Sequence, residues 1–112
     1  MSEIEAVNLS PLVLETLERD GQMLTANPPL HLHPNLDEET QQLFVVEDKA
    51  LDLLVFAFTR EQLAEEVRQH VFFCWDAYAK EQPERLTKAA QDLRTAYLNR
   101  FHEVFAISEY VP

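Results

Sequence analysis

The stretch Leu51–Tyr78 constrains the fold most, because it joins an apolar run directly to a capped amphipathic helix. The run LDLLVFAF at 51–58 has one face that is apolar throughout and a second face that is polar only at its start. This pattern predicts a strand that becomes buried on both faces. Thr59 stops the run, and Gln62 follows three residues later. Threonine and glutamine at this spacing form a capping box, so the sequence predicts a helix that begins immediately after Thr59.

This helix has one apolar stripe and two aromatic residues that do not fit it. At about 100° per residue, the stripe is roughly 120° wide and consists of Leu63, Ala64, Val67, Val71, Cys74, Trp75 and Tyr78. Phe72 lies outside the stripe, and Phe73 lies almost opposite its centre, near Asp76. An apolar side chain on a polar helix face is covered either by another element of the chain or by another chain. We therefore predict an interface that contains Phe72, Phe73 and Asp76.

Residues 11–19 can be interpreted as a helix or as a strand. Ser10 and Pro11 resemble a helix start, and Gly21 would follow the end of that helix. Asp20-Gly21 is instead typical of a two-residue hairpin turn. We favour the hairpin, because Gly21 is the only glycine in the chain and tolerates the positive φ of such a turn. The strand before the turn would place four side chains on one face: Leu12, Leu14, Thr16 and Glu18.

Strand signals continue to residue 58. Pro28 and Pro29 interrupt any strand ladder, and Leu43–Val46 is a short apolar strand. Residues 47–49 then form a turn that returns the chain into 51–58, which completes a meander.

A second helix is predicted after Pro83 ends the first. Thr87 is its predicted cap. Apolar residues then recur at intervals of three and four up to Val104, so both helices are predicted to be amphipathic and roughly twenty residues long. The expected fold is a single α+β domain over residues 1–112. It contains an antiparallel sheet of three or four strands followed by two long amphipathic helices packed on one face.

Composition restricts the expected partners. Twenty acidic against nine basic residues give a net charge of −11, which argues against binding to nucleic acid and suits a basic protein partner. The single cysteine and the lack of an apolar leader at the N-terminus indicate a cytoplasmic protein, and no apolar run is long enough to cross a membrane. One glycine cannot build a glycine-rich phosphate loop, so we expect no cofactor.

Four residues form a possible metal site. His31 and His33 are two residues apart, so they share one face of an extended segment. His70 and Cys74 are four residues apart, so they lie on adjacent turns of one helix side. Cys74 is also explained as a small buried apolar residue within VFFCWDAY.

The order of strands followed by a threonine-capped helix resembles the HicB-like antitoxin domain. The matching segment is LDLLVFAFTREQLAEEVRQHV, and the resemblance covers residues 12–80. It implies a small acidic protein that binds and neutralises a basic toxin. No DNA-binding segment is evident after the helix, so the resemblance does not extend to that part of the family's role.

These observations predict a non-catalytic protein-interaction module. It would self-associate, with a homodimer expected, and bind a protein partner through the apolar patch near Phe73 or through its acidic surface. The alternative is a metal- or small-ligand-binding protein that uses His31, His33, His70 and Cys74.

Overall fold

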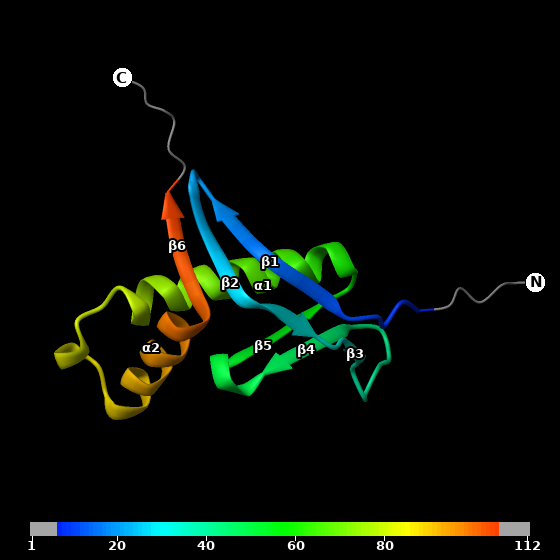
Figure 1. Cartoon of the computed structure of the whole chain (residues 1–112). Coiled ribbons are helices and arrows are strands. Elements are labelled where there is room, and N and C mark those ends of the chain that lie inside the picture. The colour runs from blue at the N-terminus through cyan, green and yellow to red at the C-terminus, as the bar shows by residue number, and fades with distance from the viewer. Residues whose placement is uncertain (1–6, 106–112) are drawn as a thin grey trace, which may run out of the picture.

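The computed structural model describes residues 7–105, in which strands and helices are combined as shown in Figure 1. The strands belong to two antiparallel sheets with the orders β1-β2-β6 and β3-β4-β5. The α+β class, the antiparallel three-stranded sheets and the two helices confirm the predicted fold class. In chain order, the elements are β1 (Leu12–Arg19), β2 (Gln22–Leu32), β3 (Asn35–Leu36), β4 (Phe44–Asp48), the 3₁₀ turn η1 (Lys49–Leu51), β5 (Leu53–Ala57), α1 (Arg60–Cys74), the π-helical segment η2 (Trp75–Ala79), the 3₁₀ turn η3 (Pro83–Arg85), α2 (Lys88–Arg100) and β6 (Phe101–Phe105).

The hairpin interpretation of residues 11–19 is confirmed. Arg19 pairs with Gln22 across a two-residue turn. Asp20 and Gly21 have φ of 47° and 81°, which are the positive values that a type I′ turn requires at both central positions.

The face predicted for β1 is wrong beyond Leu14, because a bulge in β2 interrupts the pairing of the two strands there. Leu14 pairs with Leu30, but Thr16 pairs with Thr25, so Glu15 stands alone opposite four residues of β2. Two of those four are prolines, which have no N–H to donate to a ladder. The bulge turns Leu17 into the core and leaves Thr16 exposed.

The second sheet is buried on one face only. Leu53, Val55 and Ala57 of β5 are buried, whereas Leu54 and Phe56 on the opposite face are about half exposed. The predicted burial of both faces is therefore wrong. The reason is that α1 packs against the inner face of β5, while no element among residues 7–105 covers the outer face of this strand.

Both predicted helix starts are confirmed. The Thr59 hydroxyl accepts a hydrogen bond from the Gln62 N–H at 3.0 Å, and the Thr87 hydroxyl accepts one from the Ala90 N–H at 3.2 Å. None of the helices in residues 7–105 is long and apolar enough to span a membrane.

The second helix is shorter than predicted, because it ends at Arg100 and the chain continues as β6. Phe101 pairs with Ala26 of β2, and the ladder continues to Phe105 opposite Gln22. Residues 101–105 read FHEVF, which fits a strand as well as a helical stripe. Pairing with the open edge of β2 selects the strand.

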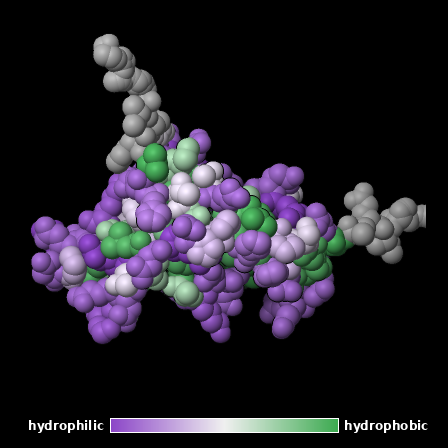
Figure 2. Space-filling view, in the orientation of Figure 1, coloured by the Kyte–Doolittle hydropathy of each residue, from purple (hydrophilic) through white to green (hydrophobic). Residues whose placement is uncertain are grey.

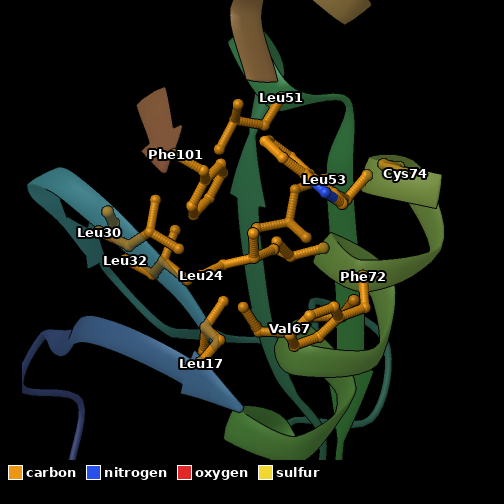
Figure 3. Packing of buried hydrophobic residues seen from close by; sticks show 14 of the residues in the cluster. Leu17, Leu24, Leu30, Leu32, Leu51, Leu53, Val67, Phe72, Cys74 and Phe101 are labelled. Atoms are coloured by element: carbon orange, nitrogen blue, oxygen red, sulfur yellow. The ribbon is translucent and has the colours of Figure 1, made fainter. Parts of the chain in front are cut away.

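The core lies between the two sheets and α1. Figure 3 shows Val67 and Phe72 of α1 pointing toward Leu17 and Leu24 of the first sheet. Phe101 from β6 stacks on Tyr97 of α2, with ring centroids 5.6 Å apart. The face seen in Figure 2 is mostly hydrophilic, with hydrophobic side chains in small areas among the hydrophilic ones.

Candidate functional site

Three exposed apolar side chains line a groove between β5 and α1. Leu54 and Phe56 stand on the β5 side and are 50% and 49% exposed, and Phe73 stands on the α1 side and is 65% exposed. The groove has a volume of about 530 Å³. We call it the β5–α1 groove.

Helical spacing builds the α1 wall of this groove. Glu66, Gln69, His70 and Phe73 are three, four and seven residues apart, so they form one stripe along the helix. This stripe lies beside the buried stripe of Leu63, Val67 and Val71, which packs in the core. The helix therefore buries one row of side chains and presents the adjacent row along the strand.

His70 ties the helix to the start of β5. Its Nε2 lies 3.0 Å from the carbonyl oxygen of Asp52, so a proton on Nε2 donates a hydrogen bond across the end of the groove. Asp52 has a left-handed backbone with φ of 52°, which turns the chain from η1 into β5. This contact fixes the distance between the two walls at one end.

The strand that forms the other wall is a sheet edge. Within residues 7–105, β5 pairs only with β4. An edge strand presents unpaired N–H and C=O groups on its open side. The groove therefore combines apolar side chains with backbone groups that can still form hydrogen bonds.

A second hollow adjoins the groove and shares Phe56 with it. It has a volume of about 640 Å³, and its apolar lining includes Leu36 and Val45. Its remaining wall is the turn that contains Asp37, Glu38 and Glu39.

Asp37 organises this turn. Its carboxylate accepts from the backbone N–H groups of Leu43 at 2.8 Å and Thr40 at 2.7 Å. The Leu43 N–H first, and then the Thr40 N–H, hold the pKa of Asp37 well below its usual range. The turn therefore presents a charged carboxylate beside the hollow at neutral pH.

Both hollows are acidic. Glu66 stands on the α1 wall, and Glu47 lies directly opposite Leu54 on the outer face of the sheet. The lining of both hollows contains no lysine or arginine. Among residues 7–105, no ion pair neutralises Glu47 or Glu66. A partner at this surface meets apolar side chains with carboxylates beside them.

The three predicted interface residues have different environments. Phe72 is buried, and the Arg19 guanidinium lies over its ring at 4.4 Å, so the chain itself covers this residue. The Asp76 carboxylate accepts from both terminal nitrogens of Arg19, at 2.8 and 3.2 Å. Of these three residues, Phe73 alone presents an uncovered apolar surface.

Sequence reasoning missed a polar cluster that joins the first sheet to η2. Glu103 of β6 accepts from the Trp75 indole N–H at 3.2 Å and from the Gln22 amide. Lys80 lies 3.7 Å from the carboxylates of both Glu103 and Asp76. Alternation along 101–105 could have placed Glu103 inside the fold, had this segment been interpreted as a strand. The cluster holds β6 against the end of α1.

The four residues predicted to bind metal are not brought together. Within residues 7–105, no three histidine, cysteine, aspartate or glutamate side chains converge on one point. His31 alternates with buried Leu30 and Leu32, so it points away from the core, whereas Cys74 is buried in it. Burial also raises the pKa of the Cys74 thiol, which disfavours the reactive thiolate.

Comparison of the chain with models of known protein families, with curated proteins and with solved structures gave no match. The resemblance to the HicB-like antitoxin domain stays a prediction from the sequence.

Proposed function

We propose that this protein is a non-catalytic interaction module that binds a protein partner through the β5–α1 groove. The observation that carries the proposal is the gathering of Leu54, Phe56 and Phe73 from two different elements at one half-exposed site. Exposed apolar side chains that gather at one site are typical of interaction surfaces. Covering the exposed half of each side chain would contribute about 1 kcal/mol per residue to binding.

The partner can be another protein or a second copy of this chain. Two β5 edges could pair antiparallel about a twofold axis, as in the homodimer that the sequence predicts. Such pairing would bring two sets of acidic residues together, including Glu47 and Glu66, which opposes it. The acidic surroundings favour a basic protein, and an antitoxin-like role is one case of such binding.

Site-specific photocrosslinking tests the proposal. The chain is produced in its own cells with p-benzoylphenylalanine in place of Phe73, which preserves an aromatic side chain at the groove. The matched control carries the same residue in place of Leu98, an exposed apolar residue of α2 that does not line the groove. We expect one defined adduct from position 73 and none from position 98.

The mass of the adduct identifies the partner. An adduct of twice 13.0 kDa indicates a homodimer, and any other discrete mass indicates a different protein. The purified partner should then bind the Phe73→Glu variant about tenfold more weakly or worse, while Leu98→Glu should bind normally. The proposal is wrong if positions 73 and 98 give the same adducts, or if Phe73→Glu leaves the affinity unchanged.

A further inference from the structure

The two walls of the β5–α1 groove run together over a distance that suits a short strand. Glu66 and Phe73 are seven helical residues apart, which corresponds to about 10 Å along the axis. Three residues of an extended chain cover about the same length. The groove therefore has the length for an extended segment of three to four residues beside β5.

The position of the apolar residues also suits an added strand. Leu54 and Phe56 are two residues apart on the outer face of an edge strand, so neighbouring side chains of an added strand would lie beside them. Side chains on the other face of that strand would point toward the α1 wall, where Phe73 and Glu66 stand. Strand addition of this kind uses main-chain hydrogen bonds for affinity and alternate side chains for specificity.

Charge selects the chemistry of the segment. Glu66 lines the groove, and Asp37, Glu38 and Glu39 line the hollow that continues it past Phe56. Lysine and arginine are missing from both linings. A segment that alternates apolar and basic residues would satisfy both the apolar floor and the acidic surroundings, whereas a second copy of this chain would add further carboxylates.

We propose that the β5–α1 groove binds an extended segment of a partner protein, with alternating apolar and basic residues, as an additional strand on the open edge of β5. This inference rests on the proposed function and specifies how the partner is recognised.

Short peptides of defined composition test the binding mode. The probes are fluorescein-labelled eight-residue peptides of alternating Val and Lys, and of alternating Val and Glu, titrated with the full chain and followed by fluorescence anisotropy. We expect the Val-Lys peptide to bind at least tenfold more tightly than the Val-Glu peptide. The double variant Glu66→Gln/Glu39→Gln should weaken Val-Lys binding about tenfold. The matched control Glu84→Gln/Asp92→Gln removes the same charge far from the groove, and it should retain the affinity.

Amide hydrogen exchange locates the added strand. Binding of the Val-Lys peptide should slow exchange along 53–57 of β5 and leave 101–105 of β6, which is also a sheet edge among residues 7–105, unchanged. Two further Val-Lys peptides are N-methylated at alternate residues, one at the odd and one at the even positions. Only one of the two sets of N–H groups would face β5, so one of these peptides should no longer bind.

The outcomes separate this inference from the proposed function. Equal binding of both peptides, equal protection of β5 and β6, or full binding by both methylated peptides overturns strand addition by a basic segment. If position 73 nevertheless crosslinks one protein, the proposed function stands and the inference alone fails. If both experiments fail, the groove is not a binding site.

Discussion

Tyr97 offers a sharp test of how the interior is held together. It is fully buried, and its hydroxyl donates a hydrogen bond to the Leu51 carbonyl oxygen at 2.9 Å. Leu51 ends η1, is separated from β5 by Asp52 alone, and is itself buried. The bond therefore connects α2 to the segment that positions β5.

The expected cost of Tyr97→Phe follows from the group left behind. The ring keeps its contacts, but the Leu51 carbonyl loses its hydroxyl partner in a buried environment, which costs about 1–3 kcal/mol. The unfolding entropy is about 2.1 cal/mol/K per residue, so in a chain of 112 residues a loss of 1 kcal/mol in the free energy of unfolding lowers the melting temperature by about 4 °C. We expect the melting temperature to fall by about 4–12 °C, measured by circular dichroism and checked by urea unfolding.

Tyr78→Phe is the matched control. Tyr78 is half-buried, and its hydroxyl makes no hydrogen bond within residues 7–105, so the variant should melt within about 2 °C of the native protein. A Tyr97→Phe variant that is as stable as Tyr78→Phe would refute the importance of the bond to Leu51.

The same environment predicts the alkaline limit of stability. Burial, and then the Cys74 thiol, raise the pKa of Tyr97 well above its usual range. Unfolding lets this phenol ionise at its ordinary pKa of about 10. The stabilisation is thus fully present below about pH 10 and is lost as the pH rises further. Urea unfolding between pH 8 and 11 should show a decline that is smaller in Tyr97→Phe.

Four further predictions concern the hairpin, the helix cap and the first sheet. Arg19→Met removes the contacts with Asp76 and should lower the free energy of unfolding by about 1 kcal/mol; a loss that is equally large in 1 M NaCl would contradict an electrostatic origin. The hydrogen bond from Arg19, first among several effects, lowers the pKa of Asp76 in the folded protein. The ionised Asp76 therefore stabilises the fold above about pH 4, and this contribution is lost as the pH falls further. Urea unfolding should show a smaller loss of stability on acidification in Asp76→Asn than in the native protein. Gly21→Ala should lower the free energy of unfolding by about 1–2 kcal/mol because φ is 81°, although nothing lies within 4 Å of the added methyl group. The control Asp20→Gly should not destabilise the protein. Equal stability of Gly21→Ala and the native protein would exclude backbone strain at this turn. Thr59→Ala should cost about 1 kcal/mol through loss of the cap, with Thr59→Ser as the control that restores it.

Local sequence signals predicted the parts of the fold that depend on a few neighbouring residues. Asp20-Gly21 specified the hairpin turn, and Thr59 and Thr87 specified the two helix starts. Each of these signals acts through hydrogen bonds or backbone angles within four residues, so no distant part of the chain was needed to interpret it.

The candidate site was predicted only in part. The position of Phe73 on a polar helix face indicated exposed apolar surface, and the structure shows this residue exposed. The sequence pattern could not show that Leu54 and Phe56 are exposed too, because a run of apolar residues has the same pattern whether one face of the strand is buried or both. The same limitation applies to Phe72, which is buried under Arg19 from a distant strand.

The sequence by itself determined the helix starts, the hairpin and the acidic character of the chain, because these depend on residue type and short-range spacing. Tertiary structure decided the rest. Pairing with the edge of β2 turned 101–105 into a strand, and the bulge in β2 opposite Glu15 changed which face of β1 is buried. The packing of α1 across β5 left this strand at the sheet edge, unpaired beside Phe73 within residues 7–105. These outcomes depend on which distant segments meet, since tertiary contacts decide where a backbone group forms its hydrogen bond and which apolar face is buried.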